Sequence, residues 1–350
     1  MPVKLGFVGV GFMGQCAHLR NYAALDGCDV VAIAEMREGL AQEVAVRYGV
    51  PRVYRSHREM LENEHLDGIV ASQQYCNHGS LIPELYQAGV PVFTEKPLAC
   101  SVEMGEKLVA ALERSKARHF VGYHKRSDPA VLHACREMRR LRRSSELGDF
   151  RYIRILMPAG DWIAGGDDCL IKSDEPKPAG MTADPLPAHM DAGTAKEFDV
   201  FVNFYIHQVN LMRHLLGEDF RIAYADPTGV LLAVKSESGL PGTIEMTPYK
   251  ATVDWPEEVF IAFERGFIKL DLPAPLAVNR SGRVTLFRDP GEGVEPSTSI
   301  PRLPWTHAMQ QQAVHFLAAI RGEDTPLCEA REALRDLRSA EEYIGLKPAR

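Results

Sequence analysis

Three glycines near the amino terminus are spaced to bind a dinucleotide. Gly9, Gly11 and Gly14 form a G-x-G-x-x-G pattern after a short apolar run, with Phe12 and Met13 between the last two glycines. Glycines at this spacing allow a tight turn and let the backbone approach a pyrophosphate at the start of the next helix. The alternative is an ordinary glycine turn, but the flanking strand and helix signals favour a cofactor site.

The second apolar run ends in an acidic residue that suits the ribose of such a cofactor. Glu35 stands about 20 residues after Gly14, the separation that dinucleotide-binding folds use. A carboxylate there accepts hydrogen bonds from the ribose hydroxyls and repels a 2′-phosphate, so we expect NAD rather than NADP. Arg37 leaves two interpretations open: it contacts the phosphate or the adenine, or it is a solvated residue at a helix start.

A lysine follows the fifth predicted strand. The segment Glu95-Lys96-Pro97 stands at the carboxyl end of that strand, and ligands of open parallel sheets bind beyond the carboxyl ends of the strands. The ammonium of Lys96 can stabilise a developing alkoxide or relay a proton, and Glu95 beside it is a cofactor candidate. A surface lysine is an equally compatible alternative.

A predicted helix over residues 201–216 carries a polar stripe. Asn203, His207, Asn210 and His214 share one side of this otherwise apolar helix. An imidazole titrates near neutral pH, which suits a general base that removes a proton from an alcohol. We therefore expect His207 to act as a base with Asn203 one turn before it, and a buried structural histidine is the alternative.

Several further polar or aromatic residues follow predicted strands or lie in a long loop: Ser72, Gln73, Asn77, His78, Tyr123, Lys125, Asp161 and Trp162. The first four follow the fourth strand and are expected near the cofactor. The next two follow the sixth strand and are candidates for contacts with nicotinamide or substrate. The tryptophan face with an adjacent carboxylate suits a sugar ring and its hydroxyls, although a loop anchor is equally compatible. Potential ligands are too few here for a metal site, so we expect no metal.

The elements that position these residues alternate regularly in the first part of the chain. Apolar strand signals recur at residues 3–8, 29–34, 53–54, 67–72, 90–94 and 119–122, and helical patterns lie between them at 12–25, 36–48, 81–88 and 101–115. Apolar strands that alternate with helices indicate a parallel sheet. We expect an α/β Rossmann domain over residues 1–125.

The rhythm changes over residues 126–350, for which we expect an α+β domain that binds substrate and mediates oligomerisation. A helix at 129–143, a strand at 150–157 and an irregular stretch at 162–194 precede the helix at 201–216. Strand signals then follow at 222–225, 229–236, 242–248, 258–265, 267–272 and 283–288, and helices at 306–321 and 328–344 close the chain. This order predicts a large, mostly antiparallel open sheet, and the helix at 328–344 is expected to pack back on the Rossmann domain.

The sequence also predicts contacts for this sheet. Its strands alternate poorly between apolar and polar residues, as in Val259-Phe260-Ile261. A half-solvated sheet shows sharper alternation. The second face is therefore covered either by the protein's own helices and loops or by another subunit.

Composition and charge limit the classes of protein to which this chain can belong. The chain has 350 residues, a mass of 38.9 kDa and a net charge of −7, which does not favour nucleic acid. No apolar stretch approaches the ~18 residues of a membrane span. The seven cysteines are scattered, which fits reduced thiols in a cytoplasmic protein. We expect no nucleic-acid or membrane partner.

Together the glycine pattern, Glu95-Lys96-Pro97 and the segment 122–129 resemble the glucose-fructose oxidoreductase/inositol dehydrogenase/MocA (Gfo/Idh/MocA) family. The resemblance implies a Rossmann domain, a second domain with an open sheet through which subunits associate, and NAD(P)-dependent oxidation or reduction of sugars and polyols. A homodimer or homotetramer is therefore expected. The family pattern Asp-x-x-x-His, whose histidine acts as acid and base, matches at His207 and departs at Asn203.

The leading hypothesis is hydride transfer between nicotinamide and the carbon of a secondary alcohol in a sugar, sugar derivative or inositol-like polyol. His207 would take the hydroxyl proton and Lys96 would hold the oxygen. A non-catalytic regulator that binds dinucleotide and sugar is one alternative, and a reductase of linear pyrroles or imines is another.

Overall fold

The computed structural model describes residues 1–176, 182–291 and 293–347, and these divide into two compact units. Unit 1 comprises Met1–Tyr123, Gly166–Asn203 and Gln312–Arg338, and unit 2 comprises His124–Gly165, Phe204–Gln311 and Ser339–Arg350. Residues 166–176, 182–203 and 312–338, which the sequence placed in the second domain, belong to unit 1, and residues 124 and 125, which it placed in the first, belong to unit 2. Residues 177–181, within the stretch expected to be irregular, and residues 348–350, within the expected second domain, lie outside the described residues.

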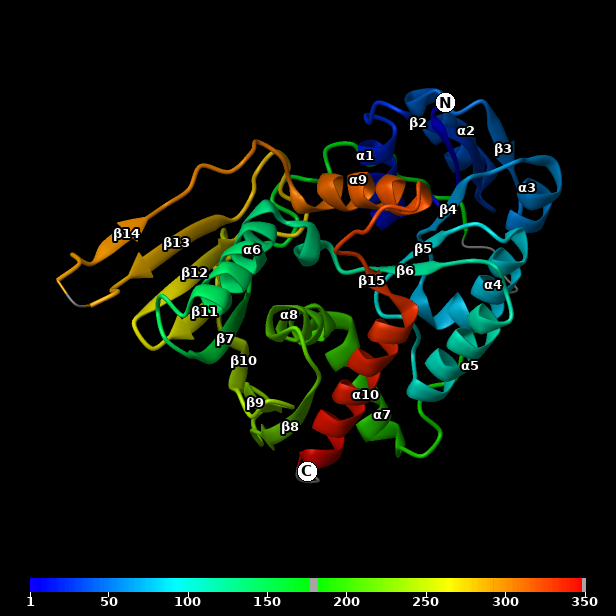
Figure 1. The fold of residues 1–350 in the computed structure, drawn as a ribbon. Coiled ribbons are helices and arrows are strands. Elements are labelled where there is room, and N and C mark those ends of the chain that lie inside the picture. Colours follow the sequence, from blue (N-terminus) through cyan, green and yellow to red (C-terminus); the bar gives the residue numbers. More distant parts are fainter. Residues whose placement is uncertain (177–181, 292, 348–350) are drawn as a thin grey trace. The chain divides into compact units, whose positions relative to one another are not determined.

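The sheet of unit 1 has the strand order β15-β6-β5-β4-β1-β2-β3 (Figure 1). All neighbours pair in parallel except β15, which runs antiparallel to β6. This order is that of a dinucleotide-binding sheet, with its topological switch point between β1 and β4. The Rossmann fold expected from the sequence is confirmed. The strands are β1 (Val3–Val8), β2 (Cys28–Ala34), β3 (Arg52–Tyr54), β4 (Gly68–Ala71), β5 (Val92–Glu95), β6 (His119–Gly122) and β15 (Cys328–Glu329).

Short helices connect these strands, and serine side chains start two of them. Ser56 caps α3 and Ser101 caps α5, each by accepting a hydrogen bond from a backbone amide of the first turn. The helices are α1 (Arg20–Tyr22), which continues the π-helical turn Gly14–Leu19, α2 (Glu38–Tyr48), α3 (His57–Asn63), α4 (His78–Leu85) and α5 (Val102–Glu113). Only α3 was not expected from the sequence, because it is a short helix without a strong apolar repeat.

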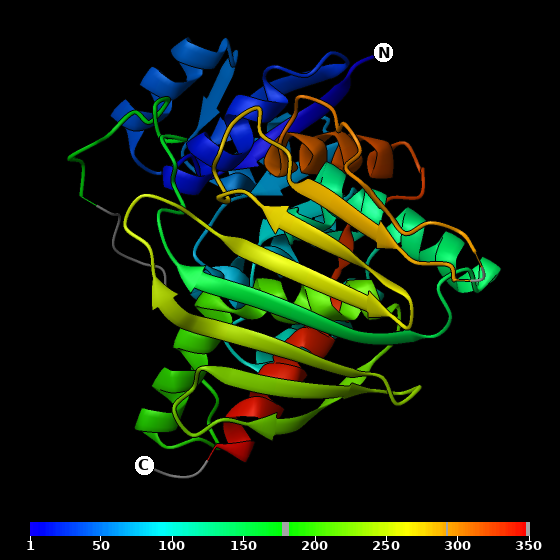
Figure 2. The same ribbon diagram turned by 90° about the vertical axis from the view of Figure 1, so that its left-hand side faces the viewer.

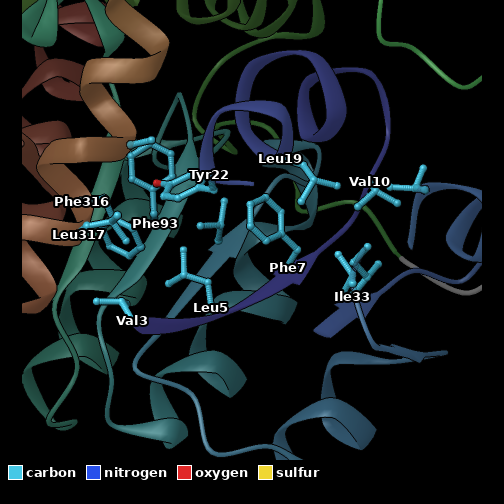
Figure 3. Close-up of a cluster of buried hydrophobic side chains, with 14 of the residues drawn as sticks. Val3, Leu5, Phe7, Val10, Leu19, Tyr22, Ile33, Phe93, Phe316 and Leu317 are labelled. Carbon is cyan, nitrogen blue, oxygen red and sulfur yellow. The ribbon is translucent and has the colours of Figure 1, made fainter. Parts of the chain in front are cut away.

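The core of unit 1 is completed by a helix from the far end of the chain. In Figure 3, Phe316 of α9 (Ala308–Ile320) lies against Tyr22 and Phe93. The ring centroids of Phe316 and Phe93 are 5.4 Å apart, and those of Phe316 and Tyr22 are 6.3 Å apart. In α10 (Ala330–Leu346), Arg331 also forms an ion pair with Glu113 of α5 at 2.8 Å.

Unit 2 contains the second sheet, with the order β14-β13-β12-β11-β7-β10-β9-β8 (Figure 2). Its pairs are antiparallel except β7 with β10, so the mostly antiparallel sheet is confirmed. Helices α6 (Pro129–Ser144) and α8 (Ile206–Leu216) contact its central strands. The strands are β7 (Phe150–Ala159), β8 (Phe220–Ala225), β9 (Leu231–Ser236), β10 (Pro241–Lys250), β11 (Glu257–Phe263), β12 (Gly266–Leu272), β13 (Arg283–Arg288) and β14 (Ser297–Ser299).

The expectation of one helix over residues 201–216 is wrong. The structure has α7 (Ala192–Phe204) and α8, with Tyr205 between them. The carbonyl of Tyr205 accepts hydrogen bonds from the amides of Gln208 and Val209, which starts a new helix. The Tyr205 hydroxyl lies 2.8 Å from the Thr247 hydroxyl of β10, which fixes the interruption to the sheet.

Within the described residues, no helix combines the length and apolar character that crossing a membrane requires.

Candidate active site

The glycine turn is as tight as its sequence predicts. Gly9 has a φ of 88°, in the left-handed region that favours glycine. A Cβ on Gly9 would lie 2.9 Å from the carbonyl oxygen of Ser72 and 2.3 Å from Nε2 of Gln73, and one on Gly14 would lie 2.6 Å from the Gly9 carbonyl oxygen. The structure thus brings the turn together with Ser72 and Gln73, as expected.

The middle glycine faces open space instead. Among the described residues, a Cβ on Gly11 would meet one atom within 4 Å, Nη2 of Arg37 at 3.7 Å. Phe12 and Met13 follow at the start of the helix and are partly exposed. An open space beside a helix N-terminus is what a pyrophosphate needs, so the residues present fit a dinucleotide.

Glu35 is where the sequence places the ribose-binding carboxylate, and Arg37 already holds it. Its side chain accepts hydrogen bonds from the Val10 amide at 3.1 Å and from Arg37 through the backbone N at 3.1 Å, Nε at 2.9 Å and Nη2 at 3.0 Å. Burial raises the pKa of Glu35, but the Arg37 and Val10 hydrogen bonds outweigh it and lower the pKa overall. The carboxylate is charged, and the guanidinium must move for a ribose diol to bind both oxygens.

A buried histidine fixes the carboxylate that precedes Lys96. Nε2 of His18 lies 2.6 Å from Oε1 of Glu95, and the backbone N of Lys96 donates to Oε2 of Glu95 at 3.2 Å. Burial raises the pKa of Glu95, yet the contact with His18 lowers it overall. His18 lies in the π-helical turn Gly14–Leu19, a type of turn that is frequent at functional sites.

Lys96 reaches the carboxyl end of α7. Its Nζ donates to the carbonyl oxygen of Asn203 at 2.5 Å. One turn earlier on the same helix, Oδ1 of Asp199 accepts a hydrogen bond from the Tyr75 hydroxyl at 2.7 Å. Unit 1 therefore places an ammonium, a carboxylate and a phenol around the end of α7. His18, Tyr75 and Asp199 were not expected from the sequence, although the polar stripe at Asn203 continues one turn back to Asp199.

His78 anchors the loop that follows Lys96. It is fully buried, and its Nδ1 lies 2.9 Å from the carbonyl oxygen of Leu98. Burial lowers the pKa of His78, so the imidazole is neutral near neutral pH and Nδ1 carries the proton that this carbonyl accepts.

In unit 2, His207 lies in the first turn of α8 above a buried polar network. Its ring meets the edge of His124, with the ring centroids 4.7 Å apart. The neighbouring Gln208 donates to Oε1 of Glu257 at 2.8 Å, and Lys125 is paired with Oε2 of the same carboxylate at 2.5 Å. The Lys125 ammonium is therefore engaged in a buried ion pair.

The remaining candidates divide into buried and exposed residues. Tyr123, the last residue of the first segment of unit 1, is 2% exposed. Asp161 and Trp162 are exposed in unit 2, where Oδ1 of Asp161 accepts hydrogen bonds from the amides of Ile163 and Ala164. The Trp162 carbonyl accepts a hydrogen bond from the amide of Leu276 at 3.1 Å, which fixes its backbone, and the residue is 39% exposed.

The single helix expected to carry Asn203 and His207 is not formed. Tyr205 interrupts it, so Asn203 belongs to α7 and unit 1, and His207 belongs to α8 and unit 2. Asn203 contributes its backbone carbonyl to Lys96 while its side chain is exposed.

Residues 3–123 match the family model described as an oxidoreductase family with an NAD-binding Rossmann fold. Residues 3–123 thus belong to the NAD-binding domain of the Gfo/Idh/MocA family of oxidoreductases. The resemblance carried by the glycine pattern and Glu95-Lys96-Pro97 is thereby confirmed.

Several curated Gfo/Idh/MocA relatives are similar over different parts of the chain. Myo-inositol 2-dehydrogenase of Thermotoga maritima is 23% identical over 69% of this chain and 63% of its own length. D-apiose dehydrogenase of Paraburkholderia graminis is 23% identical over 99% of this chain and 88% of its own length. Inositol 2-dehydrogenase of Acidothermus cellulolyticus is 31% identical, over 39% of this chain and 40% of its own length. The chain thus spans less than two thirds of the first and third of these relatives.

Solved structures share the fold along nearly the whole chain. A protein described as an NADPH-dependent oxidoreductase from Desulfitobacterium hafniense aligns with a TM-score of 0.76 at 12% identity, covering 98% of this chain and 95% of that one. An oxidoreductase from Agrobacterium radiobacter in complex with NAD⁺, L-tartaric acid and magnesium aligns with a TM-score of 0.69 at 14% identity, covering 97% and 95%. At these identities the likeness concerns the fold.

Proposed function

We propose that this Gfo/Idh/MocA protein is an NAD-dependent oxidoreductase of a secondary alcohol in a sugar, sugar derivative or inositol-like polyol. The observation that carries the proposal is the open turn at Gly11 on the same sheet edge as Lys96, at the carboxyl ends of β1 and β5. Ligands of open parallel sheets bind at this edge. The names of the curated relatives, which are dehydrogenases of inositols and apiose, support the substrate class.

The glycine turn would hold the pyrophosphate, and Glu35 would receive the ribose after Arg37 rotates away. NAD, when bound, supplies the acceptor for the hydride. An ammonium has three donors, so Lys96 can keep its bond to the Asn203 carbonyl and still donate to the substrate oxygen. Its positive charge stabilises the alkoxide that develops as the hydroxyl proton leaves.

His207 would accept that hydroxyl proton. Its position at the start of α8, beside His124, leaves the ring half-buried. The Lys125–Glu257 pair beneath it is buried, with relative side-chain exposures of 5% and 0%. We propose that this pair holds the His207 region in place and does not contact the substrate. Asp161 and Trp162 are the candidates for binding the sugar ring.

We further propose a homodimer or homotetramer formed through the sheet of unit 2. Three aromatic rings follow one another across its strands on the face opposite to the buried Val259 and Ile261: Phe260 and Phe267 lie 5.0 Å apart and Phe267 and Phe287 lie 5.5 Å apart, centroid to centroid. These rings are partly exposed, and a second copy would remove them from water.

All seven cysteines are free thiols, which fits a cytoplasmic location.

A panel of inositols, hexoses and pentoses tests the activity. The purified protein is incubated with NAD and each compound, and the absorbance of reduced nicotinamide is followed. We expect turnover with at least one cyclic polyol or sugar, and its loss in Lys96→Ala. Tight NAD binding without turnover across the panel would instead support the non-catalytic regulator.

A further inference from the structure

A segment without helix or strand, residues 166–175, lies beside the glycine-turn end of unit 1. The side-chain amide of Gln15, one residue after the glycine turn, bonds with both backbone groups of Ile171, accepting from its amide at 2.8 Å and donating to its carbonyl at 3.1 Å. Arg20 donates to the Gly166 carbonyl at 3.0 Å and to Oδ1 of Asp168 at 2.8 Å. These contacts, all within unit 1, fix residues 166–175 beside the cofactor helix.

This segment ends by placing a carboxylate on the N-terminus of α2. Oε1 of Glu175 accepts a hydrogen bond from the Leu40 amide at 2.8 Å, and Oε2 accepts one from the Gly39 amide at 3.2 Å. The Ser173 hydroxyl also donates to Oε1 at 3.0 Å. The Leu40 amide, together with the Gly39 amide, lowers the pKa of Glu175, so the carboxylate stays charged.

The same helix start carries the residues that meet the adenosine ribose. Glu35 directly follows β2, and Arg37 is the N-cap residue of α2. The two donors to Glu175 are the second and third residues of that helix. The charges of Glu175 and Arg37 are close enough to influence each other's pKa. A 2′-phosphate on the ribose would enter this small region.

The charges there do not cancel. Glu35 and Arg37 form a two-point ion pair and neutralise each other. Glu175 has backbone amides and a hydroxyl as its hydrogen-bond partners, so one negative charge remains. A phosphate would bind the Arg37 guanidinium and the backbone amides at the start of a helix. Here Glu175 already accepts from those amides, and its charge repels the phosphate.

We propose that Glu175 is a second determinant of cofactor choice, which excludes the 2′-phosphate of NADP by charge and by occupying the α2 amides. The inference rests on the proposed function, because it assumes that unit 1 binds a dinucleotide. It differs from the expectation based on Glu35, whose charge Arg37 already offsets. A simple capping role for Glu175 would stabilise α2 without changing the choice between NAD and NADP.

Binding measurements separate these roles without any need for turnover. Dissociation constants for NAD, NADP, 5′-AMP and 2′,5′-ADP are measured by calorimetry on the full-length wild type, Glu175→Gln and Glu175→Ala. Glutamine keeps the shape and one acceptor but removes the charge, whereas alanine also frees the amides of Gly39 and Leu40. Glu43→Gln is the matched control, because it removes the same charge from an exposed position further along α2.

We expect Glu175→Gln to bind NADP and 2′,5′-ADP about tenfold more tightly than the wild type, with NAD and 5′-AMP changed by less than about threefold. Glu175→Ala should shift in the same direction, and Glu43→Gln should change none of the four constants. Because Glu175 is partly exposed to solvent, the wild-type preference should also weaken with added salt.

An unchanged NADP-to-NAD ratio in both Glu175 variants, with NAD still bound by the wild type, would overturn the inference and leave the proposed function standing. If the wild type binds neither dinucleotide, the proposed function fails and the inference fails with it. Thermal unfolding of each variant identifies a simple capping role. Loss of such a cap lowers the stability of the variant while its NADP-to-NAD ratio stays that of the wild type.

Discussion

At the scale of single residues, the two groups assigned to proton and oxygen handling are held in different ways. Lys96 donates to a backbone carbonyl at the end of α7, where the helix dipole favours a cation. His207 meets the edge of His124 at the start of α8. The sequence singled out both side chains by type and spacing. It could not show that His18 fixes Glu95 beside Lys96, because that contact joins residues 77 positions apart.

Removal of His207 tests its assignment as the base. We expect His207→Ala to lose about 10²-fold or more in kcat, the usual contribution of a positioned general base. His65→Ala is the control, since His65 is exposed in unit 1 and should leave kcat unchanged. Steady-state rates of both variants are measured against pH. Near-full activity of His207→Ala would mean that another group acts as the base, and Lys96 would be the next residue to test.

At the scale of elements, the sequence predicted the strands β1 to β13 well. Most of the parallel strands β1 to β6 are buried and read as continuous apolar runs. The sequence failed where tertiary contacts decide. The helix over 201–216 is interrupted at Tyr205, whose hydroxyl bonds to Thr247 of a strand. A local sequence pattern cannot predict this contact. The short edge strands β14 and β15 were also missed, since three and two residues are too few to show a period.

The start of α6 provides a pH-dependent prediction. Asp128 caps this helix and also accepts from the Gly282 amide, and burial raises its pKa to about 6 from the ordinary value of 3.8. The folded state therefore holds its proton more tightly than the unfolded state. The resulting stabilisation is fully present below about pH 3.8 and is lost as the pH rises through about 6.

We expect this group to lower the free energy of unfolding by about 3 kcal/mol across that window, from the shift of roughly two pKa units. Asp128→Asn should lack this decline and be at least as stable as the wild type at neutral pH, because asparagine keeps an acceptor for the Ala130 amide. Urea denaturation of both proteins at several pH values measures the free energy of unfolding as a function of pH. Parallel curves for the two proteins would contradict the burial argument.

At the scale of the whole molecule, the sheet of unit 2 explains the weak alternation of its strands. One face buries aliphatic residues such as Ile155 and Val259. The other combines the row of Phe260, Phe267 and Phe287 with paired charges, including Lys269 with Glu258 at 2.8 Å. Poor alternation in the sequence was therefore a true signal of a face that is neither polar nor fully apolar.

A charge placed in this aromatic row tests the proposed assembly. Phe267→Glu should convert the dimer or tetramer into smaller species, because burying an unpaired carboxylate between subunits is strongly unfavourable. Val46→Glu, on the exposed side of α2 in unit 1, should leave the mass unchanged. Light scattering at micromolar concentration gives the masses. A monomeric wild type, or an unchanged mass for Phe267→Glu, would remove this face as the interface.

The proposed reaction transfers a hydride from a substrate carbon to NAD, and isotope labelling follows that transfer. The substrate selected by the panel is labelled with deuterium on the carbon that carries the reacting hydroxyl, and the NADH formed is analysed by mass spectrometry. We expect one deuterium in the nicotinamide ring per turnover, with none lost to water, and loss of this product in Lys96→Ala. Unlabelled NADH, or label released to solvent, would contradict it.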